Sequence, residues 1–195
     1  YVHVNGAVVP YDKAFIHIED RGFQFSDGIY EVVAVRNSCL VDSEPHFQRL
    51  DRSLRELEIA SPMSHDDLRL AIHQLIERNA LDSGTIYIQI TRGVAPRQHA
   101  IPDHVLQPTV VITTKSFQFP EPEDKAFMTC KVITVPDMRW GRRDIKSISL
   151  LANCMAMTQA NRVGAFEAVQ YDQDGFVTEG SASNAWIVTV EGEIW

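Results

Sequence analysis

The sequence predicts an α+β protein that is divided into two domains. Three observations lead to this prediction: short apolar runs separated by turn residues, two stretches of helical period in the first half, and a segment rich in proline and acidic residues near the middle. The chain has 195 residues, of which 45% are hydrophobic and 23% are charged, a composition typical of a globular protein. We expect a small α/β domain at 1–116, an extended linker at 117–125, and a β-rich domain at 126–195.

The first domain is expected to combine hairpins with two helices. Asn5-Gly6 lies between valine-rich runs and favours a two-residue hairpin, because both residues accept a positive φ angle. A second hairpin is expected around the turn at 36–38, and two further strands border a long loop at 92–108, a kind of loop that often carries function. The strands of this domain are expected at 2–4, 8–9, 30–35, 39–41, 85–91 and 109–114.

Apolar residues at helical spacing predict the two helices of this domain. The apolar face of the first consists of Phe47, Leu50, Leu54 and Leu57. The second is expected from Ser64 to Asn79. Ser64 is placed to cap it, because a serine hydroxyl accepts hydrogen bonds from the free N–H groups of the first turn, and Asp67 follows three residues later as in a capping box.

The second domain is expected to contain a strand at 130–135, a helix from Ser147 to about Val163, and a β-meander. Gly164 is expected to end the helix, because glycine accepts the left-handed conformation found there. The strands of the meander are expected at 165–171, 176–178 and 185–190. Since the sequence stops as a further strand begins, we expect this domain to be incomplete.

Composition and spacing argue against several classes of function. The 18 basic residues are outnumbered by 26 acidic ones, which gives a net charge of −8 and disfavours a nucleic acid or an anionic membrane as partner. No apolar run reaches the roughly 20 residues that span a bilayer, and the N-terminus lacks the pattern of a secretory signal. The histidines and cysteines lack metal-ligand spacing, so no metal is expected. The cysteines are expected to be buried thiols in a reducing compartment, and hence in the cytoplasm.

Lys146 has the most unusual surroundings among the lysines. It lies between Ile145 and Ile148, directly before the residue expected to cap the helix. Partial burial there would favour the neutral amine, which is a nucleophile for carbonyl carbons. A lysine whose stem covers apolar surface while its amine reaches water gives the same pattern. The surrounding residues alone leave both interpretations open.

Two further segments carry candidate binding residues. The turn at 179–184, Glu-Gly-Ser-Ala-Ser-Asn, combines one carboxylate with several small donors; such a turn binds phosphate or holds a carboxylate beside a ligand, and it is also an ordinary hairpin connection. Arg97 and His99 are separated by one residue, so an extended backbone points both to one side. A guanidinium beside an imidazole suits the capture of a carboxylate, and a solvated basic loop is the alternative.

Five segments in a fixed order carry a resemblance to a known family. They are EDRGFQFSDGIYEVV at 19–33, HFQRL at 46–50, ITRGVAPRQH at 90–99, MRWGRRDIKSISLL at 138–151 and VTEGSASN at 177–184. Together they resemble the class IV aminotransferases, which are pyridoxal 5'-phosphate enzymes of fold type IV, and among these the D-amino acid aminotransferases. The resemblance covers nearly the whole chain. It implies a small α/β domain followed by a cofactor-binding pseudo-barrel, of which this chain holds the first part.

The resemblance implies a role for the residues of a cofactor site. Lys146 matches the lysine that forms a Schiff base with the cofactor, and Glu179 matches the carboxylate at the pyridine nitrogen. Arg49 matches the arginine that holds the phosphate, and Arg139 matches the arginine that supports the glutamate. The turn residues of that site are Ser181, Ala182 and Ser183. Alanine at the middle position replaces a serine that is common in the D-amino acid enzymes.

The resemblance also implies a substrate site and a dimer. Tyr30, Arg97 and His99 match the carboxylate trap of the D-amino acid enzymes. In that family the arginine and the histidine reach the site from the partner subunit, which implies a homodimer. The PRQH pattern at 96–99 distinguishes this group from the branched-chain aminotransferases and from aminodeoxychorismate lyase, which have the same fold.

The activity implied is the transfer of the amino group of D-amino acids, of the D-alanine type, to 2-oxo acids such as 2-oxoglutarate. One alternative is another enzyme of this fold: a branched-chain L-aminotransferase, an (R)-amine transaminase or aminodeoxychorismate lyase. A second alternative is a truncated, non-catalytic remnant. The early end of the sequence favours the remnant, whereas the presence of Lys146, Glu179 and Arg49 argues against it.

Overall fold

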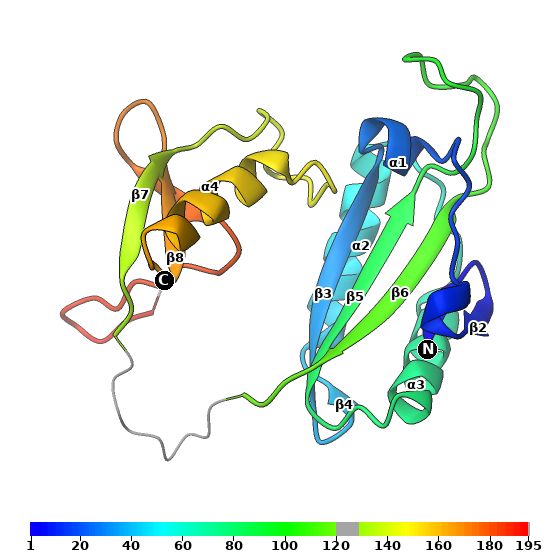
Figure 1. Cartoon of the computed structure of the whole chain (residues 1–195), viewed down its shortest axis with the longest axis horizontal. Helices are drawn as coiled ribbons and strands as arrows, with labels where there is room; N and C mark the ends of the chain where they lie inside the picture. The colour runs from blue at the N-terminus through cyan, green and yellow to red at the C-terminus, as the bar shows by residue number, and fades with distance from the viewer. Residues whose placement is uncertain (120–128, 195) are drawn as a thin grey trace. The chain divides into compact units, whose positions relative to one another are not determined.

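The computed structural model describes residues 1–119 and 129–194, which belong to two compact units (Figure 1). The units are Tyr1–Pro122 with Asp144–Ile148, and Glu123–Arg143 with Ser149–Trp195. Most of the expected linker at 117–125 lies outside the described residues. The expected domain boundaries therefore stay a prediction.

A six-stranded antiparallel sheet forms the centre of the first unit, with the strand order β2-β1-β6-β5-β3-β4 (Figure 1). Its strands are β1 (Val2–Val4), β2 (Ala7–Val9), β3 (Gly28–Arg36), β4 (Cys39–Leu40), β5 (Gly84–Thr91) and β6 (Thr109–Ser116). All six predicted strands are confirmed, with small shifts at their ends. Asn5 and Gly6 both have positive φ angles, 48° and 89°, as the predicted hairpin turn requires.

Two long helices and two short ones complete the first unit. They are the 3₁₀ helix η1 (Tyr11–Lys13), α1 (Arg21–Phe25), α2 (Ser43–Glu56) and α3 (His65–Arg78). The backbone N–H of Asp67 donates to Ser64 Oγ at 3.1 Å, so the predicted cap of α3 is confirmed. The five-residue helix α1 was not predicted from the sequence; Asp20 caps it by accepting from the N–H of Gly22 at 2.8 Å.

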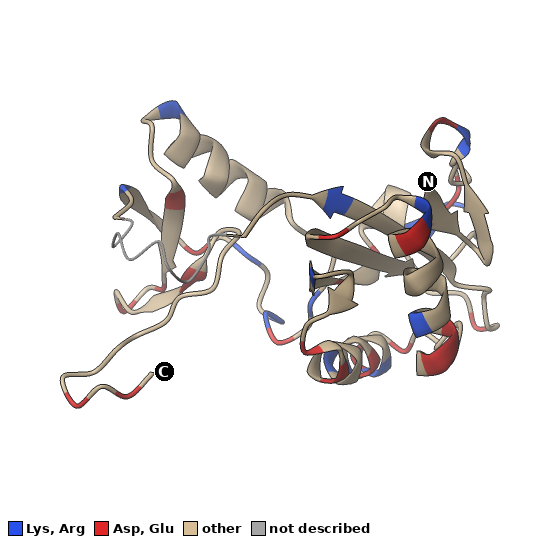
Figure 2. Cartoon of the chain, turned by 90° about the horizontal axis from the view of Figure 1, so that it is seen from below, with Lys and Arg blue, Asp and Glu red and all other residues tan. Residues whose placement is uncertain are grey.

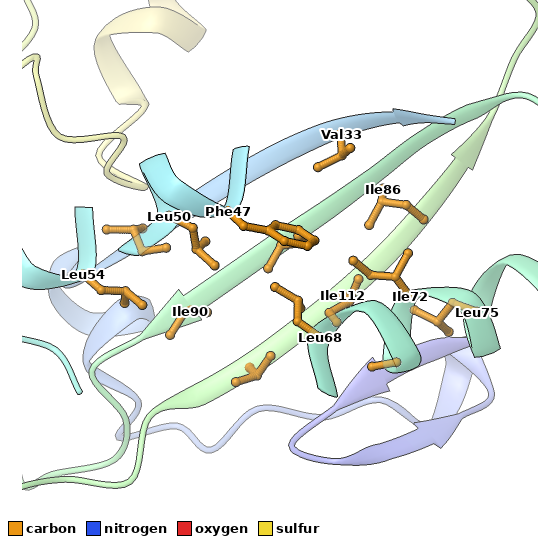
Figure 3. Close-up of a cluster of buried hydrophobic side chains, with 14 of the residues drawn as sticks. Val33, Phe47, Leu50, Leu54, Leu68, Ile72, Leu75, Ile86, Ile90 and Ile112 are labelled. Carbon is orange, nitrogen blue, oxygen red and sulfur yellow. The ribbon is translucent and has the colours of Figure 1, made fainter. Parts of the chain in front are cut away.

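The core of this unit lies between the sheet and the helices α2 and α3 (Figure 3). Alternate residues of β3 face the helices, and Val33 on that face is fully buried. Phe47 from α2 and Ile72 from α3 meet on it, also at 0% exposure. Ile145, from the separate segment Asp144–Ile148, belongs to the same cluster. The core of the first unit thus fixes the residue next to Lys146.

The second unit is a small β-α-β-β arrangement. Its elements are β7 (Val132–Pro136), α4 (Leu151–Arg162), β8 (Glu167–Tyr171) and β9 (Val177–Gly180). β7 and β8 are parallel, as strands joined by a helical crossover are, and β9 returns antiparallel to β8. Ala156 and Ala160 pack α4 closely against Val135 and Ala168 of the sheet. The hairpin of β8 and β9 carries Glu179 on its second strand.

The predicted helix start at Ser147 is wrong, because α4 begins at Leu151. Ile148 N–H donates to the carbonyl of Gly28 at 3.1 Å, and Tyr30 N–H donates to the carbonyl of Lys146 at 3.0 Å. These backbone groups extend the ladder of β3, so they cannot form a first helical turn. The predicted end of the helix is confirmed, since Gly164 follows it with a φ of 65°.

The predicted strand at 185–190 is also wrong. Only an isolated bridge between Val188 and Ile194 forms there. Trp186 and Val190 are 70% and 99% exposed, so the apolar side chains of this segment are not buried in a core within the described part of the chain. An alternating pattern forms a stable strand only when one face finds a core to cover.

Surface features differ in part from expectation. The cysteines at 39, 130 and 154 are exposed, so the prediction of buried thiols is wrong.

Residues of both charge signs occur on the helices of the first unit, whereas α4 carries a charge only at Arg162 (Figure 2). Among the residues that the structure describes, no helix could cross a membrane, and no group of side chains could hold a metal ion.

Candidate active site

The backbone of Lys146 is fixed between the sheet and α2. Its N–H donates to Ser53 Oγ at 3.3 Å, while its carbonyl accepts from Tyr30 as described above. Arg52, one residue earlier on α2, holds the start of the segment by donating to the carbonyl and carboxylate oxygens of Asp144 at 2.7 and 2.9 Å. The position of Lys146 is therefore set by contacts within the first unit.

The amine of Lys146 lies against Tyr30. Nζ is 3.3 Å from Tyr30 Oη and 4.4 Å from the centroid of its ring. The side chain is half-buried, and none of the described carboxylates forms an ion pair with this amine. An amine held in this way is available to a carbonyl carbon, as the nucleophile interpretation of the sequence requires.

Tyr30 is itself held by Tyr87 of β5. Their ring centroids are 5.5 Å apart and the ring planes differ by 24°, a stacked arrangement. Burial, and then the nearby Tyr30, raise the pKa of Tyr87 to about 12. Tyr87 consequently keeps its proton at physiological pH and donates it to Gln89 Oε1 at 3.0 Å. The stack therefore gives the tyrosine at the lysine a defined orientation.

Arg49 is anchored on a buried carboxylate. Glu31 lies on the helix-facing side of β3 with an exposure of 0%. Arg49 donates to its two oxygens at 2.5 and 2.7 Å, and His46 Nδ1 lies 2.8 Å from one of them. This paired geometry fixes the guanidinium plane. Because 47% of the Arg49 side chain remains exposed, it stays accessible to an anion.

Arg49 and Lys146 are linked through α2. Ser53, which binds the backbone of Lys146, comes four residues after Arg49, so both project from one side of the helix about 6 Å apart along its axis. The first unit thereby groups an amine, a tyrosine and an anchored guanidinium at one end of β3.

Arg97 and His99 meet at one aromatic ring. The guanidinium carbon of Arg97 is 4.8 Å from the ring centroid of Phe25, and the imidazole centroid of His99 is 5.6 Å from it. Both residues are exposed. Within the described residues, no hydrogen bond, ion pair or ring contact joins this pair to Lys146 or Tyr30. The structure thus brings the two loop residues together at Phe25 and gives them no such contact with the lysine.

Glu179, in the second unit, is held by Arg139. The Nη1 group of Arg139 donates to Glu179 Oε2, while its Nη2 and Nε groups donate to Asp137 at 2.8 and 3.1 Å. The side chain of Asp137 is fully buried, and hydrogen bonds from Arg139 hold the pKa of its carboxyl well below its usual range. This pairing fixes the guanidinium group that contacts Glu179. The Glu179 side chain is 44% exposed, so it is oriented and still accessible to a cation.

The turn after Glu179 closes on another buried carboxylate, Glu167. The hydroxyls of Ser181 and Ser183 donate to it, the latter at 2.7 Å, and the N–H groups of Ala168, Ser181 and Ala182 donate at 2.7, 3.1 and 3.1 Å. Burial alone would raise the pKa of Glu167, but these hydrogen bonds outweigh it and lower the pKa. The donors of the turn thus fix its shape by converging on Glu167.

Replacing Glu167 by Gln is expected to lower the free energy of unfolding by about 1–3 kcal/mol near pH 7, because an amide cannot accept all of these hydrogen bonds. Folding lowers the pKa of Glu167. The stabilisation that this carboxylate provides is therefore complete at pH values above its pKa in the unfolded chain, about 4.3, and is lost as the pH falls through its pKa in the folded protein. Urea denaturation at pH 7 and pH 3.5 measures the difference. Glu191→Gln, at an exposed residue, is the control. If Glu167→Gln lowers the free energy of unfolding by the same amount at both pH values, the assignment is contradicted.

Three carboxylates of the site were missed in the sequence: Glu31, Asp137 and Glu167. Two of them carry a visible signal, because a single charged residue interrupts an apolar strand pattern, in YEVVAV at 30–35 and in AFEAVQY at 165–171. A charge on a buried strand needs a partner, and here the partners are an arginine from a helix and the donors of a turn.

Comparison with known proteins places the chain in one family. The family model described as amino-transferase class IV matches residues 28–195. A D-alanine aminotransferase from Bacillus licheniformis is 38% identical over 183 residues, which are 94% of this chain and 63% of that protein. The chain therefore spans less than two thirds of the length of this relative.

The solved structures that resemble the chain include two aminotransferases. The branched-chain amino acid aminotransferase of Escherichia coli superposes with a TM-score of 0.81 at 20% identity, over 97% of this chain and 65% of that one. A hypothetical aminotransferase from Mycobacterium tuberculosis in its PLP-bound form gives 0.79 at 22% identity, over 97% and 68%. At these identities the likeness concerns the fold, and the predicted α+β fold of type IV is confirmed.

Proposed function

Because the chain belongs to the class IV aminotransferase family, we propose that the whole protein transfers the amino group of D-amino acids, such as D-alanine, to 2-oxo acids such as 2-oxoglutarate. One observation carries this proposal: the half-buried amine of Lys146 lies against Tyr30 without an ionic partner among the described residues. The 38% identity to a D-alanine aminotransferase supports the substrate class. We further propose a homodimer in the cytoplasm, with no nucleic acid or membrane as partner.

Taken one by one, the side chains present suit the chemical groups of pyridoxal 5'-phosphate. Lys146 offers an amine for the aldehyde, Glu179 an oriented carboxylate for the ring nitrogen, and Arg49 an anchored guanidinium for the phosphate. Arg139 would hold Glu179 in place. The turn residues Ser181, Ala182 and Ser183 would form the wall of the site. When bound, the cofactor supplies a ring that accepts the electron pair left when the substrate Cα loses its proton.

Lys146 would move the proton in this reaction. In its neutral form the amine would remove the proton from the substrate Cα, and as an ammonium it would hold that proton until it is returned. The amine lies over the face of the Tyr30 ring, 4.4 Å from its centroid, where an ammonium group makes a cation–π interaction. Glu179 provides a fixed negative charge, which favours a protonated ring nitrogen opposite it.

Arg97, His99 and Tyr30 would bind the substrate carboxylate, with the first two acting from the partner subunit. Arg97→Ala is expected to raise the KM for D-alanine by about 10- to 100-fold, since a charge-assisted hydrogen bond to a carboxylate is lost, while cofactor binding is unchanged. Steady-state kinetics and cofactor absorbance measure both. Gln98→Ala, a change at the exposed residue between the pair, is the control, and an unchanged KM for Arg97→Ala would remove Arg97 from the site.

A panel of amino donors tests the substrate class. We expect kcat/KM for D-alanine to exceed that for L-alanine by at least about 100-fold, because a site that fixes the carboxylate presents the Cα proton of one enantiomer to the lysine. Preference for L-leucine would indicate a branched-chain aminotransferase, and preference for an (R)-configured amine would indicate an amine transaminase. Release of 4-aminobenzoate from aminodeoxychorismate would indicate a lyase. A whole protein that retains no cofactor would be a remnant.

A further inference from the structure

Phe25, the last residue of α1, lies at the centre of a cluster of side chains and has itself no role in the reaction scheme above. Besides Arg97 and His99, the guanidinium carbon of Arg21 lies over its ring, 4.9 Å from the centroid. Two arginines on one aromatic ring are attracted by its negative face. The half-buried phenyl group thus joins a short helix to the loop that carries the proposed carboxylate trap.

Arg21 also holds the backbone of that loop. Its Nη1 group donates to the carbonyl of Gln98 at 2.9 Å and to that of Ala100 at 3.4 Å, and its Nη2 group donates to the carbonyl of His99 at 3.4 Å. Arg21 is only 3% exposed. One buried guanidinium therefore spans three consecutive carbonyls, and this contact sets the path of the loop between Arg97 and Ala100.

Asp27 connects this arrangement to the rest of the first unit. It accepts from Arg21 Nε at 2.7 Å and from Arg92 Nε at 2.8 Å. Arg92 in turn donates to the carbonyls of Leu57 and Glu58, just after α2, at 2.6 and 3.0 Å. The start of the loop and its functional end are thus tied to one carboxylate and to the end of a core helix.

Among the arginines of this cluster, ion pairing within the described residues leaves Arg97 available. Arg21 and Arg92 both pair with Asp27, whereas Arg97 forms no ion pair with any carboxylate of the described residues. The guanidinium carbon of Arg97 lies over the Phe25 ring, and this cation–π contact uses none of the N–H groups of Arg97. Arg97 can therefore bind a carboxylate with two parallel hydrogen bonds while Phe25 fixes its orientation.

We propose that Phe25 and Arg21 are positioning residues that hold Arg97 and His99 ready for the substrate carboxylate. The inference rests on the proposed function and deepens it. Phe25 orients the two side chains and Arg21 the backbone between them, so substrate binding does not have to order this loop. Preorganisation of this kind strengthens binding without taking part in the proton transfer.

The test uses the whole protein loaded with pyridoxal 5'-phosphate. We expect Phe25→Leu, which removes the aromatic face, to raise the KM for D-alanine about tenfold and to leave kcat within about twofold. The dissociation constant of D-lactate, a carboxylate without an amino group, should rise by the same factor. Phe25→Tyr keeps the ring and should behave as the wild type. Phe23→Leu is the matched control, because Phe23 lies on the same helix and is 76% exposed.

Each outcome decides between the two proposals. If Arg97→Ala weakens D-lactate binding and Phe25→Leu does not, the positioning role is wrong and the proposed trap stands. If Phe25→Tyr raises the KM for D-alanine as much as Phe25→Leu does, the aromatic ring does not position Arg97 and the inference is overturned. A fall in the kcat of Phe25→Leu with an unchanged KM also overturns it. If Arg97→Ala binds D-lactate like the wild type, the trap itself is wrong. Should Phe25→Leu fail to fold by circular dichroism, Phe25→Met, with an unbranched and adaptable side chain, takes its place under the same criteria.

Discussion

Lys146→Ala is expected to abolish transamination in the whole protein, with kcat reduced by at least about 10⁴-fold. The variant loses the group that would bind the cofactor aldehyde and move the Cα proton. The hydrogen-bond partner of its amine is the hydroxyl of Tyr30, and a hydroxyl cannot form a Schiff base with an aldehyde. The measurement is the rate of pyruvate formation from D-alanine and 2-oxoglutarate. Borohydride reduction followed by peptide mass analysis should attach the cofactor to Lys146 in the wild type and to no residue in the variant.

Two controls isolate the amine from the fold. Lys146→Met keeps most of the apolar stem and should be as inactive as the alanine variant, with a similar melting temperature. Lys13→Ala removes an exposed amine, 70% accessible and paired with Asp12, and should leave the rate unchanged. Turnover of D-alanine by Lys146→Ala at the wild-type rate would refute the assignment.

Glu179→Gln is expected to lower kcat by about 100-fold or more while the cofactor remains bound. The amide removes the negative charge that favours a protonated ring nitrogen, but it leaves the amine and the phosphate anchor in place. Arg139 keeps its contacts with Asp137 in the variant, so the local structure should persist. Single-turnover measurements with D-alanine separate this loss from any change in product release.

The matched control for this variant is Asp174→Asn, which makes the same acid-to-amide change in the exposed turn between β8 and β9. We expect its rate to equal that of the wild type. Unchanged turnover in Glu179→Gln would show that the carboxylate does not assist the cofactor ring. Loss of bound cofactor, measured by absorbance after gel filtration, would instead make Glu179 a binding group.

Local patterns sufficed to predict most elements of the first unit. The turn at Asn5-Gly6 and the cap at Ser64 depend on residues that are close in sequence, and both are found as predicted. The segment at 146–148 is different, because its backbone pairs with β3 more than a hundred residues earlier. No helical propensity in the sequence reveals that competition, and it moves the start of α4 by several residues.

The candidate site shows the same division. Arg97 and His99 could be recognised as a pair because they are near neighbours in an extended segment. The buried carboxylate that anchors Arg49 could not be paired from sequence, because Glu31 meets it only when α2 packs on β3. Phe25 and Arg21 were missed for the same reason: their contacts with the loop join residues more than 70 positions apart.

The segment Asp144–Ile148 has a consequence for how this protein can be divided. The polypeptide leaves the first unit, contributes β7 to the second, and returns with five residues before it leaves again. A fragment ending at 119 would keep all six strands of the sheet but would lack Ile145 in its core and the amine itself. The two halves of the chain are therefore not exchangeable modules. Replacing the half after residue 119 by that of a relative would also replace the segment Asp144–Ile148, and with it Lys146. The backbone of the new segment would then have to pair with β3 of this protein.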